Sequence, residues 1–301
     1  MSQAVIRTDS LTKYYGKNRG VLELSFEVRP GEVFGFLGPN GAGKTTTIRV
    51  LMDFIRPTEG VAQVFGLDSQ RDSVEIRRRV GYLPGELALY DNLTAGELLR
   101  HFAHLRGGVE WGYVRELAAR LDLGLRQRIS SLSQGNKRKV GLVQALMHRP
   151  ELLLLDEPTN GLDPLVQQEF YRLVSEVKAE GRTIFLSSHN LPEVERVCDR
   201  VGVIRLGRLV AVEEIEALKR RAFRQLEIHF AQPVPAQAFE DVQGVRDVRV
   251  DDGVLQCSVV GSLDGLVKKA AQFEVVNIVS HEPSLEQIFL AYYGGGMDDV
   301  A

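Results

Sequence analysis

The sequence has few cysteines and no long apolar runs. Two cysteines, Cys198 and Cys257, lie far apart and have no C-x-x-C partner. Such usage suits a reducing cytoplasm and gives no sign of a disulfide framework or a cysteine-based metal site. No apolar run approaches the roughly 18 residues that a membrane-spanning helix requires. We therefore expect any membrane role of this chain to come through another chain.

The chain also lacks an excess of basic residues. It carries 37 Lys and Arg against 40 Asp and Glu, a formal net charge of −3. This balance argues against a nucleic-acid protein whose affinity rests on overall basicity. The first ten residues are polar and contain no apolar segment, so we expect no signal peptide. At 301 residues the chain is long enough for two globular domains.

A glycine-rich loop dominates the first third of the chain. Residues 38–46 read GPNGAGKTT and match G-x-x-x-x-G-K-[ST]. An apolar strand is expected before the loop, at 33–37, and a helix after it, at 45–54, which is the order that phosphate binding requires. We expect Lys44 to reach the β- and γ-phosphates of a nucleotide and Thr45 to offer its hydroxyl to Mg²⁺. The residues expected to hold the nucleotide here are Gly38, Pro39, Asn40, Gly41, Ala42, Gly43, Lys44, Thr45 and Thr46.

Short apolar strands alternate with helices over much of the chain, which predicts an α/β fold with a parallel sheet covered on both faces. Two antiparallel arms are expected before the loop, joined by a connection over residues 16–20. Between 94 and 150 the pattern becomes helical, with Leu98, Leu99, Phe102 and Leu105 at helical spacing. We interpret this block as an inserted helical subdomain. The other expected elements are strands at 4–10, 22–28, 61–65, 80–83, 152–156, 183–186, 201–206 and 209–212, and helices at 72–79, 164–180, 191–198 and 213–221.

The composition changes after residue 223. Residues 224–301 hold twelve Asp and Glu against five Lys and Arg. The expected order of elements in this part is β-α-β-β-α-β, the ferredoxin-like plan. We therefore predict two domains, 1–220 and 221–301. The elements expected in the second domain are strands at 225–230, 245–250, 254–260 and 275–280, helices at 235–242 and 263–273, and a last helix at 284–293.

Two carboxylates end the four-leucine strand. A carboxylate at this position, beside a phosphate loop, is where a P-loop enzyme holds Mg²⁺. We assign that role to Asp156 and expect Glu157 to polarise the attacking water. A surface Asp-Glu pair would not explain so apolar a preceding strand. His189 ends the next strand, so parallel pairing should bring it to the same edge of the sheet. Tyr15 could stack on an adenine ring or could be a half-exposed strand aromatic.

These motifs, with Leu132–Asn136 and Gly161–Asp163 between them, occur in an order that resembles the ATP-binding subunit of an ABC transporter over residues 3–220. The resemblance implies two cassettes arranged head to tail with two ATP molecules at their interface. Each ATP would meet the phosphate loop of one subunit and Ser133 and Gly135 of the other. The loop that contains Asp163 would run along the interface, His189 would contact the γ-phosphate, and Tyr15 would be the adenine-stacking position.

The chain departs from the family pattern at two places. The signature segment usually ends in Gly-Gly-Gln, and here it ends in Gln134-Gly135-Asn136. The family's glutamine that touches Mg²⁺ is expected near position 85, which is Gly85 in this chain. Either Glu86 substitutes for that glutamine or water fills the position.

The resulting prediction is an ATPase subunit, a homodimer at the cytoplasmic face of the membrane, that drives export through a separate permease. The segment 283–289 resembles that of drug- and antibiotic-exporter ATPases. A soluble cassette acting on ribosomes or DNA and a non-hydrolytic regulator are the alternatives. In the family a permease helix enters a groove beside the helical subdomain. We expect residues 86–94 to line it, with Leu87, Leu89 and Tyr90 either facing the permease or packed under the subdomain.

Overall fold

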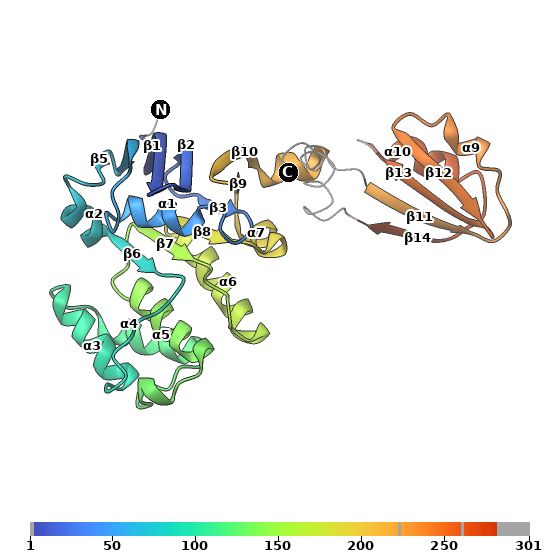
Figure 1. The fold of residues 1–301 in the computed structure, drawn as a ribbon. Coiled ribbons are helices and arrows are strands. Elements are labelled where there is room, and N and C mark those ends of the chain that lie inside the picture. Colours follow the sequence, from blue (N-terminus) through green and yellow to red (C-terminus); the bar gives the residue numbers. More distant parts are fainter. Residues whose placement is uncertain (1–2, 222–223, 260–261, 282–301) are drawn as a thin grey trace. The chain divides into compact units, whose positions relative to one another are not determined.

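The computed structural model describes residues 3–221, 224–259 and 262–281. The chain divides into two compact units, Met1–Glu213 and Glu214–Ala301, which appear at opposite ends of the colour scale in Figure 1. This boundary precedes helix α8 (Ile215–Arg221), which the sequence placed in the first domain. The domain limits of 220 and 221 remain a prediction.

A six-stranded sheet forms the centre of the first unit, in the order β10-β9-β3-β8-β7-β6. Its pairs β3–β8, β3–β9, β7–β8 and β6–β7 are parallel. Every residue of β3, β7 and β8 is buried, as expected for strands covered on both faces. The strands are β3 (Val33–Leu37), β6 (Val80–Leu83), β7 (Leu152–Asp156), β8 (Thr183–Ser188), β9 (Arg200–Arg205) and β10 (Arg208–Glu214). The predicted α/β fold is confirmed.

An antiparallel sheet of order β2-β1-β4-β5 packs near the central sheet. Rings from both sheets form one stack, in which Phe26 lies 5.7 Å from Phe34 and 6.1 Å from Phe185 between centroids. Strands β1 and β2 are separated only by residues 16 and 17. The predicted connection over 16–20 was therefore wrong, because pairing continues to Tyr15 and Asn18. The strands are β1 (Ile6–Tyr15), β2 (Asn18–Val28), β4 (Glu59–Val64) and β5 (Leu67–Asp68).

Four helices connect the strands of this unit. Helix α1 begins at Lys44, directly after the glycine-rich loop. Helix α6 starts with Pro164 at its first position, where a missing N–H costs nothing. The helices are α1 (Lys44–Leu51), α2 (Ser73–Arg79), α6 (Pro164–Ala179) and α7 (Leu191–Val197).

The inserted helical block contains α3 (Ala95–Leu105), α4 (Trp111–Arg120), the short 3₁₀ helix η1 (Ile129–Ser131) and α5 (Gln134–Leu146). Figure 1 shows these helices gathered together below strand β6. A reciprocal capping box between Thr94 and Glu97 starts α3. Leu98 and Leu99 are fully buried, whereas Leu105 is 69% exposed. The predicted helical spacing is present, and Leu105 is the last residue of α3.

The second unit has a four-stranded antiparallel sheet of order β12-β13-β11-β14. With its two helices, this order is the predicted ferredoxin-like arrangement. The helices are shorter than expected. The elements are β11 (Arg224–Phe230), α9 (Gln237–Glu240), β12 (Val245–Asp251), β13 (Val254–Val259), α10 (Asp264–Ala270) and β14 (Val275–His281). The helix expected at 284–293 and the segment 283–289 lie outside the described residues.

The core of the second unit is built around aromatic rings. Phe230, Phe239 and Phe273 lie 5.8 Å apart, ring centroid to ring centroid, and Phe239 is fully buried.

In the described part of the chain, no helix combines the length and the apolar character needed to span a membrane.

Candidate nucleotide site

The loop between β3 and α1 needs glycine at two of its positions. A Cβ at Gly38 would lie 2.3 Å from the carbonyl oxygen of Ile204, which excludes any side chain. Gly43, the residue before α1, has a φ of 113°, a conformation that L side chains rarely adopt. The loop therefore curls tightly and directs the first N–H groups of α1 toward its centre, where a helix favours an anion.

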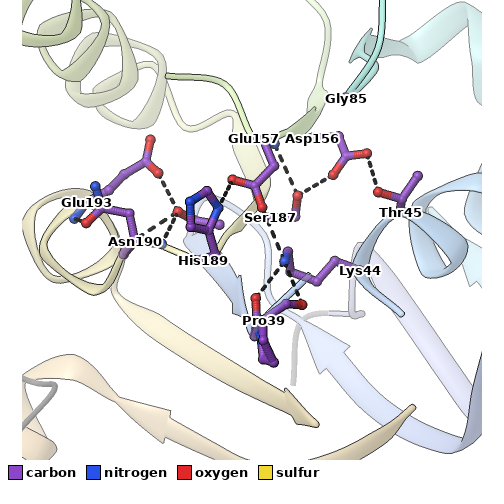
Figure 2. Close-up of polar contacts among 12 residues, drawn as sticks. Pro39, Lys44, Thr45, Gly85, Asp156, Glu157, Ser187, His189, Asn190 and Glu193 are labelled. Carbon is purple, nitrogen blue, oxygen red and sulfur yellow. Dashed lines mark hydrogen bonds and ion pairs between the residues drawn. The ribbon is translucent and has the colours of Figure 1, made fainter. Parts of the chain in front are cut away.

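Lys44 holds the loop closed from within. Its side chain is 6% exposed, and Nζ donates to the carbonyl oxygens of Gly38 at 2.6 Å and Pro39 at 3.2 Å. The same Nζ forms an ion pair with Oε1 of Glu157 at 3.2 Å. The lysine thus joins the loop to the end of β7, as the dashed lines in Figure 2 show.

Asp156 is the last residue of β7 and is fully buried. Thr45 donates its hydroxyl to Oδ2 of Asp156 at 2.7 Å, and Ser187 donates its hydroxyl to Oδ1. Asp156 and Ser187 are register partners in the parallel pair β7–β8. The hydroxyl of Thr45 and this carboxylate are hard oxygen donors of the kind that Mg²⁺ prefers.

Gly85 is the residue that faces the Asp156 carboxylate. A Cβ at position 85 would lie 2.9 Å from Oδ2 of Asp156, and Figure 2 shows the two residues side by side. Glu86 is exposed. The absence of a side chain at position 85 keeps Oδ2 of Asp156 uncrowded, and this carboxylate and the Thr45 hydroxyl are oxygen donors that fit Mg²⁺. Whether Glu86 or water takes the place of the family's glutamine stays a prediction.

Glu157 stands between a lysine and a histidine. Its Oε2 lies 2.7 Å from Nδ1 of His189, opposite the ion pair with Lys44 (Figure 2). The Glu157 backbone has a φ of 51°, in the left-handed region that is costly for a residue with a side chain. Its N–H is held by the carbonyl and hydroxyl oxygens of Ser187, both at 3.2 Å. Parallel pairing of β7 and β8 thus brings His189 to the edge that carries Glu157, as the strand order indicated.

Tyr15 also lies beside the loop. Its hydroxyl is 3.4 Å from Oγ1 of Thr46, and its side chain is 43% exposed. The ammonium of Lys13 lies 5.5 Å from the ring centroid. An exposed aromatic face at the mouth of the loop can stack on a base, so the geometry is compatible with both interpretations of this tyrosine.

Three expected site residues form a separate group, away from the Lys44–Glu157 contact. Ser133 is the N-cap of α5 and accepts from the N–H of Asn136 at 3.2 Å. A Cβ at Gly135 would lie 2.4 Å from the carbonyl oxygen of Gly161. Asp163 is the N-cap of α6 and is 54% exposed. Bonding to the N–H of Val166 lowers the pKa of this carboxyl.

Two buried charged residues near the site were missed from sequence. Arg138 on α5 is 4% exposed and donates to main-chain oxygens at the ends of β6 and β7. Glu193 on α7 is 2% exposed, and its Oε2 accepts from the hydroxyl of Ser188 at 2.5 Å. Burial raises the pKa of Glu193. Both lie in charged, polar stretches that predict surface residues; the one available signal was that Glu193 follows His189 by about one helical turn.

Comparison with known proteins extends these observations. Residues 21–160 match the family model described as ABC transporter. The bacitracin transport ATP-binding protein BcrA of Bacillus licheniformis is 38% identical over 300 residues, which cover 97% of this chain and 98% of that protein. This chain belongs to the ABC transporter ATP-binding proteins. The linearmycin resistance ATP-binding protein LnrL of Bacillus subtilis is 32% identical, with 98% of this chain and 100% of that protein covered.

The fold comparison agrees. A solved structure titled as an ATP binding subunit of an ABC transporter has a TM-score of 0.66 and 32% identity, and the match covers 72% of this chain and 92% of that one. The expected family, the ATP-binding function and the ATPase assignment are confirmed, and the ABC relatives give no support to a role on ribosomes or DNA. The roles of the individual site residues remain predictions.

Proposed function

We propose that this ABC ATPase works as a homodimer at the cytoplasmic face of the membrane and drives export of an antibiotic-like compound through a separate permease. The observation that carries the proposal is the meeting of Lys44, Asp156, Glu157 and His189 at one edge of the central sheet. These are the charges that phosphoryl transfer to water needs, and catalysis of this kind rests on positioning and electrostatics.

Nucleotide binding would redirect Lys44. Its ammonium donates to two loop carbonyls and pairs with Glu157. A triphosphate would offer stronger, fully charged acceptors at the same place. The N–H groups of the loop and of α1 would hold the remaining phosphate oxygens. The exposed ring of Tyr15 would cover the base.

Thr45 and Asp156 are the residues that would hold Mg²⁺, with water beside Gly85. When bound, Mg²⁺ would offset the negative charge that develops on the phosphate oxygens. Among the described residues, Thr45 would offer its hydroxyl and Asp156 its buried carboxylate, both oxygen donors of the kind that Mg²⁺ prefers.

Hydrolysis would depend on the ionised Glu157. Its carboxylate would accept the proton of the attacking water, and release of Lys44 to the phosphates would free Oε1 for that task. His189, 52% exposed and bonded to Oε2, would keep the carboxylate oriented and would reach the γ-phosphate. Ser133 and Gly135 of the second subunit would complete the site, and Asp163 would lie along the interface.

A hollow of about 950 Å³ between α2 and the helical block is the surface we propose for the permease. Val74 and Leu105 line it and are 63% and 69% exposed. Arg77, Arg78 and Arg149 add basic charge, so an amphipathic permease helix with acidic residues on its polar face fits it.

The three apolar residues of the segment 86–94 differ in exposure. Leu87 is half-buried and packs against Gly141 of α5, as in the alternative that these residues tuck under the helical subdomain. Leu89 is also half-buried, whereas Tyr90 is 59% exposed. Tyr90 is therefore the member of this group that remains available to a partner.

The relatives named for bacitracin transport and linearmycin resistance suggest antibiotics as the exported class. The test is to express the chain in a sensitive host together with a candidate permease, a polytopic membrane protein from a neighbouring reading frame. We expect raised resistance to an antibiotic of this kind with the wild-type pair and none with Lys44→Ala. Equal resistance with that variant would contradict ATP-driven export.

Docking is tested by co-purification of the same pair. Leu105→Asp should lose the permease, because docking would bury an unpaired carboxylate. Val61→Asp is the matched control, since Val61 is 49% exposed on β4 and does not line the hollow. Retention of the permease by Leu105→Asp would move the docking surface elsewhere.

A further inference from the structure

One buried guanidinium binds both segments that flank the Asp156 carboxylate. Nη1 of Arg138 donates to the carbonyl oxygens of Pro84 and Gly85, both at 2.8 Å. Nη2 donates to the carbonyl oxygen of Asp156 at 2.7 Å and to that of Glu157. Four of the five N–H donors of the arginine are thus used on main-chain acceptors from two strand ends.

These contacts hold a segment of backbone that has an unfavourable conformation. Glu157 adopts a φ of 51°, and that conformation sets the direction in which its side chain leaves the strand. Ser187 holds the N–H of Glu157, and Arg138 holds the carbonyl oxygens of Asp156 and Glu157, one from each peptide group that flanks the Cα of Glu157. The carboxylate between Lys44 and His189 is therefore aimed by a peptide fixed at both ends.

The contact to Gly85 has a second consequence. Gly85 has no side chain with which to reach the Asp156 carboxylate beside it. The guanidinium of Arg138 joins the Gly85 and Asp156 segments through their main-chain oxygens instead. A polar link between the two segments therefore exists in this chain, and it comes from α5.

Arg138 also lies close to the start of α5. It is five residues after Ser133, the N-cap of that helix, and the helix is a rigid element. Movement of Ser133 and Gly135 would consequently be transmitted to the peptide that aims Glu157. The neighbouring Lys137, whose side chain is 30% exposed, instead pairs with Asp91 at 3.3 Å. The contacts to the ends of β6 and β7 therefore come from Arg138 and not from Lys137.

We propose that Arg138 is a positioning residue for hydrolysis, which fixes the Asp156–Glu157 peptide and couples it to the segment Ser133–Gly135. The proposal rests on the proposed role of Glu157 as the group that accepts the water's proton. Within the ranges that the structure describes, the hydrogen bonds of Arg138 go to Pro84, Gly85, Asp156 and Glu157 and not to the loop at Lys44, so we expect the ATP affinity of the single subunit to be independent of Arg138.

The test compares Arg138→Met and Arg138→Lys with the matched control Lys137→Met. For Arg138→Met we expect kcat to fall about tenfold or more, since small misplacement of a catalytic group is costly, while the Kd for a fluorescent ATP analogue stays within about twofold. Arg138→Lys keeps the charge but loses the fork, so its kcat should lie between. Lys137→Met should match the wild type in both measurements.

A double-mutant cycle with Glu157→Gln separates positioning from general support of the fold. If Arg138 acts through Glu157, adding Arg138→Met to Glu157→Gln should slow single-turnover hydrolysis by much less than tenfold. A full additional loss, or a normal kcat in folded Arg138→Met, overturns the proposal. If Arg138→Met does not fold by circular dichroism, the cycle is run with Arg138→Lys. An unchanged rate in Glu157→Gln alone would instead contradict the role of Glu157.

Discussion

Replacing Lys44 by alanine tests the phosphate loop most sharply. The change removes two hydrogen bonds to loop carbonyls and the ion pair with Glu157 at 3.2 Å. It also removes the charge that would meet the β- and γ-phosphates. Truncating one partner of a buried charge pair costs about 2–5 kcal/mol. Taking about 3 kcal/mol gives a loss of ATP affinity of about a hundredfold, since 1.4 kcal/mol is tenfold.

The measurement is a fluorescence titration of the isolated subunit with an ATP analogue. Lys178→Ala is the control, because Lys178 is a half-exposed lysine on α6 that pairs with Asp199 and has no contact with the loop. We expect wild-type affinity in the control. A folded Lys44→Ala subunit that binds with an unchanged Kd would refute the assignment of residues 38–46 to the phosphates.

Two further predictions concern the corner beside Asp156 and a half-buried histidine, His148. Gly85→Ala should raise the Mg²⁺ concentration needed for half-maximal ATPase activity, since its Cβ would crowd Oδ2 of Asp156 at 2.9 Å. The control Gly112→Ala on α4, where a Cβ has space, should leave that concentration unchanged. An equal Mg²⁺ requirement in Gly85→Ala and the wild type would contradict a metal site beside Gly85. Burial first and Arg106 second lower the pKa of His148 to about 4 from 6.5. Folding thus favours the neutral ring, whereas the unfolded chain takes up a proton below pH 6.5. The free energy of unfolding should therefore fall by about 2 kcal/mol between pH 6.5 and pH 4, a figure reduced for solvent screening. Urea unfolding of wild type and His148→Gln checks this, and an identical pH dependence would contradict it.

The site residues that could be predicted from the sequence are those whose residue type and place in the strand order both indicate the same position. The glycine-rich loop, the apolar strand Leu152–Asp156 and the position of His189 were predicted because parallel strands end at one edge. The turn between β1 and β2 was not, since the length of an antiparallel hairpin depends on cross-strand pairing that residue type alone does not reveal.

The burial of Arg138 and Glu193 was not predicted, for a different reason. A charged residue on a helix is normally exposed, and only the fold shows that main-chain carbonyls or a serine hydroxyl surround these two. Leu105 shares helical spacing with the buried Leu98 and Leu99, yet at the end of α3 its side chain is exposed. Which residue faces Asp156 was likewise open until the structure placed Gly85 there.

The most direct test of an ATP-hydrolysing cassette that works as a dimer is the mass of Glu157→Gln in the presence of ATP. An amide cannot take up the water's proton, so hydrolysis should slow by about 10²–10⁴-fold while both halves of each site can still bind ATP. Light scattering on a sizing column should then give twice the 33.5 kDa mass of the chain, with two ATP molecules per dimer. A variant that stays monomeric with ATP and hydrolyses it at the wild-type rate would contradict the account.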